Sequence, residues 1–327
     1  MWREVKSLIR KNRSFLVTTH VFPDGDAIGS QLALAHALRR LGKKVLLVNA
    51  HPVPEVYRFL DPRRSIKTYG RDLAKPIRHC DAAFVLDVSS LARVGAVGDA
   101  IKAAGLKIAC IDHHVTHAQF ADVSVVGSRF AATGEMVYDL IQALGVPVTP
   151  RLATCLFVAV ATDTGWFRYP NTRPHTLRVA AELMDRGAKT DKIYAAVHER
   201  VRWQRMALMK CALETLRSEC DGRLAHFCVT QQMMRETGAT DEDTDNFSNI
   251  PRALGDVQLI LFFRELEDGQ VKVSLRSKAG PPVTPLAAKH GGGGHARAAG
   301  ATVPGPLKRA MRAILADARR LVRRNTP

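Results

Sequence analysis

The sequence predicts an α/β protein, with a parallel sheet in an N-terminal domain and a smaller, mixed α/β domain at the C-terminus. Three observations support this fold class. In the first half, short and continuously apolar segments alternate with longer amphipathic ones, as in parallel sheets covered by helices. A run of helical patterns follows. Beyond it, apolar strand patterns joined by an Asp-Gly turn signal indicate a second sheet with a hairpin.

The length of the chain, 327 residues, is enough for about two domains. Hydrophobic residues make up 46% of the sequence, which allows each domain a sizeable core. We expect the N-terminal domain to span residues 1–190, a helical linker to span 191–220, and the C-terminal domain to span 221–327.

The chain is strongly basic, with 48 Lys and Arg against 31 Asp and Glu, a formal net charge of +17. This excess favours a polyanionic partner such as nucleic acid, although solubility alone could also account for it. The six cysteines form no C-x-x-C pair and indicate small core residues in a reducing compartment. The N-terminus lacks a cleavable apolar segment, and the longest apolar run, 155–161, is too short to cross a bilayer. We therefore expect a soluble, cytoplasmic protein with no membrane partner.

The N-terminal domain is expected to alternate buried strands with helices. Gly42 ends the first of these helices, and Thr149 followed by Pro150 is typical of an N-cap and a first-turn proline. The predicted strands are 15–20, 44–49, 82–88 and 107–112, and the predicted helices are 27–42, 132–145 and a segment that starts at 150.

Polar side chains follow the apolar elements of this domain. Because sites in open α/β sheets form at the carboxyl ends of the strands, we expect these side chains to converge. They are His20, Asp24 and Asp26 after the first strand, Asp87 after the third, Asp112, His113 and His114 after the fourth, and Asp163 after the apolar segment 152–161. Taken singly, each cluster also has a simpler interpretation: an N-cap at Asp26, a turn at Asp24, a solvated loop at 112–114 and a helix exit at Asp163.

Five clustered aspartates would repel one another and raise each other's pKa, and divalent cations remove that conflict. A calcium-binding loop is excluded because Ile28 and Ala35 occupy its ligand positions. The clusters contain no cysteine, which argues against structural zinc. Carboxylates with imidazoles favour Mn²⁺, with Mg²⁺, Co²⁺ and Fe²⁺ left open. The ligands suffice for two ions, which at about 3.5–4 Å from each other would activate a water for attack on phosphorus.

Four segments resemble, in order, the motifs of the DHH phosphoesterase superfamily. They are HVFPDGDAIGS (20–30), VLDVSS (85–90), IDHHVTH (111–117) and ATDTGWFRY (161–169). GGGGHARAAGA (291–301) resembles the glycine-rich signature of the associated C-terminal domain, and VKVSLRS (271–277) is similar to the strand that precedes it in the nanoRNase (oligoribonuclease) and pAp-phosphatase branch. The resemblance covers nearly the whole chain and implies a catalytic N-terminal domain and a substrate-binding C-terminal domain.

The resemblance also implies a role for each motif residue. One metal ion would be bound by His20, Asp24 and Asp87, and the other by Asp26, Asp87, His113 and Asp163, with Asp87 bridging. The catalytic group would be Asp112, His113 and His114: Asp112 would orient a neighbouring histidine, and His114 would face the substrate phosphate. The rest of the nucleotide would be held by Arg276, His295 and the backbone of Gly292, Gly293 and Gly294. The segment 279–290, which precedes the glycine-rich signature, contains prolines where the family usually has acidic and apolar residues. The resemblance therefore does not define the shape of the edge of the substrate site.

The C-terminal domain is expected to follow helices over 174–219. Its predicted strands are 223–230, 257–266 and 270–277, and Asp268-Gly269 joins the last two as a hairpin that carries Arg276. The glycine-rich stretch 291–300 has three interpretations: a flexible linker, a dinucleotide fingerprint, or a nest of backbone N–H groups that opens a helix. We favour the third, while His295 could instead be a simple cap.

Two further features have a structural and a functional interpretation. A basic helix is predicted at 306–324, by default as a solvated outer helix and alternatively as a wall that attracts RNA. Trp166, Phe167 and Tyr169 could stack a base, although packing is the preferred interpretation so near a hinge.

The preferred function is a metal-dependent phosphoesterase that releases nucleoside monophosphates from very short RNA and also removes the 3′-phosphate of pAp. One alternative keeps the fold and cleaves cyclic di-AMP or its linear product. Another is a nucleic-acid-binding protein without turnover, favoured by the charge and disfavoured by the complete ligand set. An inorganic pyrophosphatase is disfavoured because the glycine-rich C-terminal motif resembles the nucleotide-cleaving branches. A homodimer is left open.

Overall fold

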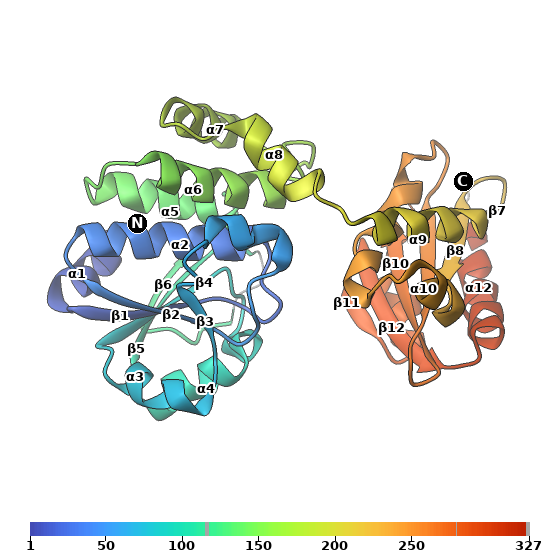
Figure 1. The fold of residues 1–327 in the computed structure, drawn as a ribbon, viewed down its shortest axis with the longest axis horizontal. Helices are drawn as coiled ribbons and strands as arrows, with labels where there is room; N and C mark the ends of the chain where they lie inside the picture. Colours follow the sequence, from blue (N-terminus) through green and yellow to red (C-terminus); the bar gives the residue numbers. More distant parts are fainter. Residues whose placement is uncertain (115–117, 279, 325–327) are drawn as a thin grey trace. The chain divides into compact units, whose positions relative to one another are not determined.

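The computed structural model describes residues 1–114, 118–278 and 280–324. The chain divides into two compact units, Met1–Arg200 and Val201–Pro327, each built around its own sheet (Figure 1). The predicted fold class is confirmed, because the first sheet is parallel and the second is mixed. Within the described ranges, no helix combines the length and the apolar character needed to cross a membrane.

Six strands of the described chain form the first sheet, in the order β3-β2-β1-β4-β5-β6. The chain runs outward from β1 in one direction through β2 and β3 and in the other through β4 to β6, which creates a topological switch point beside β1. The strands are β1 Ser14–Thr18, β2 Lys44–Asn49, β3 Ile66–Thr68, β4 Ala82–Leu86, β5 Lys107–Asp112 and β6 Val123–Val126. All four predicted strands are present, and β3 and β6 are short edge strands that the sequence analysis did not identify.

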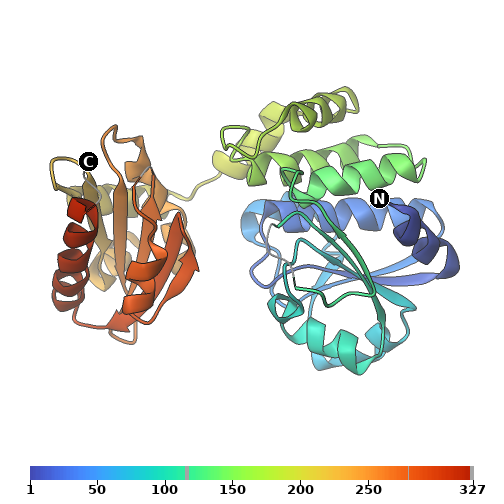
Figure 2. The same cartoon turned by 180° about the vertical axis from the view of Figure 1, so that it is seen from behind.

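Helices cover both faces of the first sheet (Figures 1 and 2). Alternate residues of β1 serve the two faces: Phe15 and Val17 pack under α2, α5 and α6, whereas Leu16 packs against α3 and α4. The helices of this unit are α1 Arg3–Lys11, α2 Gly25–Arg40, α3 Ala74–Arg78, α4 Ala96–Ala103, α5 Thr133–Ala143, α6 Pro150–Asp163, α7 Pro174–Asp185 and α8 Thr190–His198, with short 3₁₀ turns η1 Glu55–Leu60, η2 Arg71–Leu73 and η3 Leu91–Val94. Thr149 caps α6 as predicted, since its hydroxyl accepts the N–H of Leu152 at 3.4 Å.

Helices α2, α5 and α6 approach one another closely because glycines face the contacts. A Cβ on Gly29 of α2 would lie 2.3 Å from the carbonyl oxygen of Cys155 in α6. A Cβ on Gly134 of α5 would lie 2.4 Å from the methyl group of Ala159. No larger residue fits either position without moving a helix, so these glycines set the spacing of the three helices.

The second sheet has the strand order β11-β12-β10-β9-β8-β7 in the described part of the unit. Strands β8 and β9 run parallel, and the remaining neighbours are antiparallel. Gly269, with φ +78, forms the predicted turn between β9 and β10. The strands are β7 Arg217–Glu219, β8 Leu224–Val229, β9 Leu259–Glu265, β10 Gln270–Ser277, β11 Gly293–His295 and β12 Ala298–Pro304.

Two apolar layers enclose this sheet. Phe227 and Phe262 pack with Leu208 of α9 on one face, whereas Leu261 packs with Ile314 of α12 on the other. The helices are α9 Trp203–Glu214, α10 Gln231–Thr237, α11 Thr284–Lys289 and α12 Leu307–Arg324, with 3₁₀ turns η4 Asp241–Thr244 and η5 Phe247–Ala253. The predicted last helix is therefore confirmed as α12.

The glycine-rich stretch differs from its prediction. It does not open a helix: β11 and β12 form an antiparallel hairpin, in which Gly294 pairs with Ala299. Strand β12 also pairs along its whole length with β10, and this ladder overrides the helix propensity of its alanines. Gly292 is required because a Cβ there would lie 2.1 Å from the carbonyl oxygen of Gly300.

Candidate metal centre

The turn after β1 carries the first polar cluster. Asp24 is the N-cap of α2, and its carboxylate accepts the N–H of Ala27 at 3.0 Å. The predicted N-cap at Asp26 is therefore wrong: Asp26 lies in the first turn of α2 and is 1% exposed. The helix starts two residues earlier than predicted because Gly25 and Asp26 already have helical geometry.

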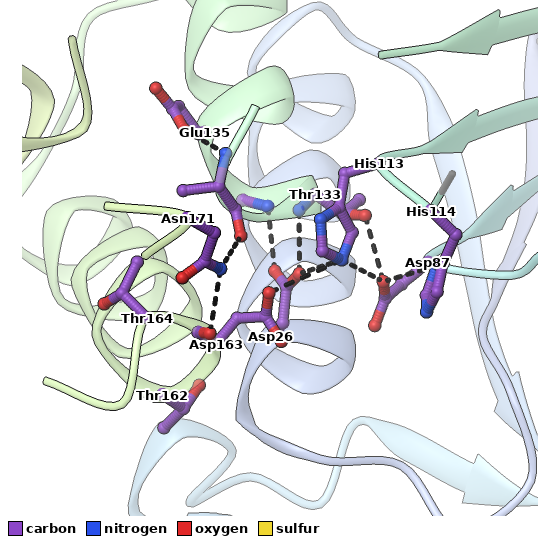
Figure 3. Close-up of polar contacts among 12 residues, drawn as sticks. Asp26, Asp87, His113, His114, Thr133, Glu135, Thr162, Asp163, Thr164 and Asn171 are labelled. Atoms are coloured by element: carbon purple, nitrogen blue, oxygen red, sulfur yellow. Dashed lines mark hydrogen bonds and ion pairs between the residues drawn. The ribbon is translucent and has the colours of Figure 1, made fainter. Parts of the chain in front are cut away.

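Asp26 is held by donors from two helices, and Figure 3 shows those from α5. Its carboxylate accepts the backbone N–H groups of Thr133 at 2.7 Å and Gly134 at 2.8 Å, both in the first turn of α5. The hydroxyl of Ser30 donates to it at 2.9 Å. The first N–H groups of a helix have no partner within the helix and stabilise an acceptor placed there. These three hydrogen bonds therefore hold the carboxylate of Asp26 in one position.

Asp87 occupies the centre of the cluster. It follows β4 with φ +59, an uncommon backbone conformation for a residue with a side chain, and is 3% exposed. Its carboxylate lies 3.5 Å from Nε2 of His20 and 3.5 Å from Nε2 of His113. The hydroxyl of Thr133 donates to it at 3.1 Å (Figure 3).

The two histidines after β5 differ in their contacts. Nδ1 of His114 donates to the buried carboxylate of Asp112 at 2.6 Å, so the expected orienting bond is made to His114. Nε2 of His113 lies 3.5 Å from Asp163 and 3.9 Å from Asp26. The last three residues of this motif, 115–117, lie outside the described residues.

The potential ligand atoms fall into three groups, each with its atoms within 4.8 Å of one another: His20, Asp24 and Asp87; Asp26, His113 and Asp163; and Asp87, His113 and His114. The first group contains the same three residues as one expected ligand set. The second contains three members of the other set but lacks Asp87, whose carboxylate lies 3.5 Å from His113. Which residues bind an ion remains a prediction.

The carboxylates of the cluster perturb one another. Burial and the negative charge of Asp87 raise the pKa of Asp24 and hold the pKa of Asp26 well above its usual range. Burial, with His113 opposing it and Asp87 adding to it, raises the pKa of Asp163 to about 6. Burial also opposes ionisation of Asp87, but His20 and His113 hold its pKa below the ordinary value.

These residues fit a divalent metal. Within the described ranges, no Lys or Arg forms an ion pair with Asp24, Asp26, Asp87 or Asp163. Among the described residues, the cationic partners of these acids are imidazoles, and the carboxylates of raised pKa would ionise readily beside a metal cation. Mixed oxygen and imidazole donors suit Mn²⁺ and related ions.

Among the residues that sequence reasoning missed, Thr133 touches the cluster and Tyr57 lies near it. Thr133 contacts both Asp87 and Asp26, yet it belongs to a helix start with no metal-binding signature. Tyr57 of η1 lies near Asp24: burial and that charge raise the pKa of its phenol to about 12, so it keeps its proton at neutral pH. The signal for Thr133 was the ATGE sequence, which places a hydroxyl and two free N–H groups at a helix N-terminus.

The predicted substrate-binding residues lie in the second unit. Arg276 of β10 and His295 of β11 are both register partners of Ala298 in β12, so their side chains share one face of the sheet. Gly292, Gly293 and Gly294 adjoin His295, which is exposed. The geometry thus brings Arg276, His295 and the glycine-rich backbone together within this unit.

Of the aromatic residues after Asp163, Trp166 and Phe167 have packing roles, as preferred, whereas Tyr169 is 40% exposed. Trp166 contacts the rings of Tyr194 and His198 of α8, and Phe167 contacts Phe157 of α6. They connect the end of α6 to its neighbours.

Comparison with known proteins identifies the chain. Residues 14–160 match the model of the DHH family, N-terminal domain, and residues 225–324 match the DHHA1 domain. The bifunctional oligoribonuclease and PAP phosphatase NrnA of Thermus thermophilus is 39% identical over 88% of this chain and 84% of its own length. The chain belongs to the DHH family. This confirms the resemblance that the motifs indicated.

Another curated protein and two solved structures are also similar to the chain. NrnA of Bacillus subtilis is 26% identical over 89% of each chain. The crystal structure of an exopolyphosphatase-related protein from Bacteroides fragilis has a TM-score of 0.92 at 27% identity and covers 98% of this chain and 96% of its own. RecJ of Thermus thermophilus, solved in complex with Mn²⁺, has a TM-score of 0.59 at 15% identity over 99% of this chain and 55% of its own, which shows a shared fold.

Proposed function

We propose that this DHH protein is a metal-dependent phosphoesterase that degrades very short RNA to nucleoside monophosphates and also dephosphorylates pAp to AMP. The names of the NrnA relatives support both substrates. The observation that carries the proposal is the position of Asp87, within 3.5 Å of an imidazole in each of the two ligand groups. All six cysteines are free thiols, which supports a reducing compartment such as the cytoplasm.

We assign two divalent cations to this site, Mn²⁺ first among them. His20, Asp24 and Asp87 would hold one, and Asp26, His113 and Asp163, with Asp87 shared, would hold the other. When bound, the cations would lower the pKa of the attacking water and offset charge on the phosphoryl oxygens. The donors to Asp26 and Asp87 from α5 would keep both carboxylates oriented, which a reaction of two ions on one phosphate requires.

The reaction adds one water across a P–O bond. The water oxygen bonds to phosphorus, the ester oxygen leaves with one proton, and the other proton stays on the new phosphate hydroxyl. His114 would donate a hydrogen bond to the phosphate. Its bond to Asp112 raises the pKa of its imidazole, and burial, which opposes this effect, leaves that pKa above its ordinary value. Arg276 and His295, on one face of the second sheet, would hold the remaining part of the nucleotide.

The test is turnover with Mn²⁺ of RNA of two to five nucleotides, pAp and cyclic di-AMP. We expect cleavage of the short RNA and of pAp. Asp87→Ala should lower turnover by at least a thousandfold while remaining folded, because it removes the shared carboxylate. Asp185→Ala, at an exposed acid that ends α7, is the matched control and should retain wild-type turnover.

Three outcomes would contradict the proposal. Turnover of the cyclic substrate alone would assign the protein to a different substrate class. Turnover that persists in Asp87→Ala would exclude the shared carboxylate. RNA binding without any turnover would leave a binding protein.

A further inference from the structure

An exposed aromatic ring stands in the middle of the first ligand-bearing turn. Phe22 lies two residues from His20 and two from Asp24, and its side chain is 76% exposed. Its φ of +53 is an uncommon conformation for a bulky residue, and it precedes Pro23, which restricts the backbone further. A conformation of this kind persists only where the surrounding structure enforces it, and here it directs an apolar ring into solvent beside the metal centre.

The orientation of this ring is fixed from one side. The imidazole of His51 stacks on it, with centroids 4.0 Å apart and planes 19° from parallel. The N–H of Phe22 also donates to Nδ1 of His51 at 3.3 Å. His51 follows β2, the neighbour of β1, so both residues lie at the carboxyl edge where the polar cluster forms. The result is a two-ring stack.

A cation lies close to the same turn. The N–H of Val21 donates to the backbone carbonyl of Arg93 in η3 at 2.7 Å, which docks η3 against the turn. Gly95 continues this contact, since a Cβ there would lie 2.9 Å from Val21 and 3.2 Å from Ala50. In the described part of the chain no carboxylate forms an ion pair with Arg93, and its positive charge acts on the imidazole of His114 in the polar cluster.

We propose that Phe22, backed by His51, is a stacking platform for a nucleobase next to the scissile phosphate. The inference rests on the proposed function and adds a base-binding element that lies entirely within the first unit. An exposed, pre-oriented aromatic ring offers a π-face to any base. The positive charge of Arg93, which acts on His114, favours the phosphate that is linked to that base. The platform binds one base of a short oligonucleotide without selecting its sequence.

The test compares three substrates: an RNA dinucleotide, and the same dinucleotide with either the 5′ or the 3′ base replaced by hydrogen. Stacking of one base corresponds to about a tenfold effect on binding. We expect Phe22→Ala to raise KM about tenfold for the intact dinucleotide and to leave KM unchanged for the one substrate that lacks the stacked base. Phe22→Trp should restore the wild-type KM, because it keeps a flat ring.

The matched control is Leu41→Ala. Leu41 is 38% exposed and lies past the far end of α2, roughly 24 Å along the helix axis at 1.5 Å per residue. Calorimetric titration with Mn²⁺ should give Phe22→Ala a wild-type affinity. The inference is overturned if Phe22→Ala changes KM equally for all three substrates or for none, if Leu41→Ala reproduces its effect, or if Mn²⁺ binding is lost. A wild-type protein that cleaves no dinucleotide would instead refute the proposed function, and the platform with it.

Discussion

Removing one carboxylate from the candidate metal centre should raise the folding stability of the metal-free protein and lower that of the metal-bound protein. Asp163, which ends α6, is 29% exposed and lies among other acids. Burial, opposed by His113 and reinforced by Asp87, raises its pKa to about 6. In the metal-free protein its ionisation at neutral pH therefore costs folding free energy. Asp163→Asn removes that charge, so we expect the variant to be more stable than wild type without metal and to gain less stability from Mn²⁺.

The size of the effect follows from linkage. A pKa of about 6 in the folded state against an ordinary value of 3.8 corresponds to about 3 kcal/mol above pH 7. Because solvent screens part of the charge, we expect roughly 1–2 kcal/mol. The raised pKa means that the folded state holds its proton more tightly, so stability is lost as pH rises from about 4 through 6. The gain in stability of the variant over wild type should therefore be largest above pH 7 and about a third as large at pH 4.5.

Urea unfolding of wild type and variant at pH 7.5 and pH 4.5, in EDTA and in excess Mn²⁺, measures all of this. In EDTA the variant should unfold at higher urea at pH 7.5. In Mn²⁺ the order should reverse, because ligand binding stabilises only the state that binds it. A variant less stable than wild type in EDTA at pH 7.5 would refute the reasoning, since Asp163 would then stabilise the fold through its contacts.

Three further changes test other parts of the structure. Thr133→Val removes the donor to Asp87 and should lower kcat about tenfold, with Thr133→Ser restoring it in the same steady-state assay. Asp112→Asn should lower kcat about 10- to 100-fold, and NMR titration should show a lower pKa for His114, which Asp112 now raises. Hydrogen bonds from Arg319 lower the pKa of Glu219 to about 2, although partial burial opposes this shift. The ionised Glu219 therefore stabilises the fold above pH 4.5, and this stabilisation is lost as pH falls towards 2. Glu219→Gln should therefore cost roughly 1–2 kcal/mol in urea unfolding at pH 7, with the difference vanishing near pH 2.

The sequence predicted the centre of the first unit well because two simple patterns coincide there. Buried parallel strands are continuously apolar, and polar residues at their carboxyl ends must share one edge. That reasoning predicts that His20, Asp87 and His113 lie together, and the distances between them agree with it. The edge strands β3 and β6 were missed because they are short and partly exposed, so they lack an apolar run.

The errors arose where tertiary contacts override local preference. Alanines near His295 favour a helix in isolation, but a ladder with β10 on one side and β11 on the other draws them into β12. The ATGE sequence marked Thr133 only as part of a helix start, because its importance comes from a residue 46 positions earlier, Asp87. Only the packed structure places that hydroxyl.

The glycines between the helices have a consequence for mutational tolerance. Asp26 lies on α2, its N–H donors lie on α5, and Asp163 ends α6, so the distances among these groups depend on how closely the three helices pack. Ala at Gly29 would push α2 and α6 apart without touching a predicted ligand, whereas Ala at Gly134 would press on α6 and would also lie 3.3 Å from the carboxylate of Asp26. A random mutagenesis screen for inactive but folded protein should therefore recover substitutions at these glycines alongside those at the charged residues. The inactivating positions would then extend into the apolar core.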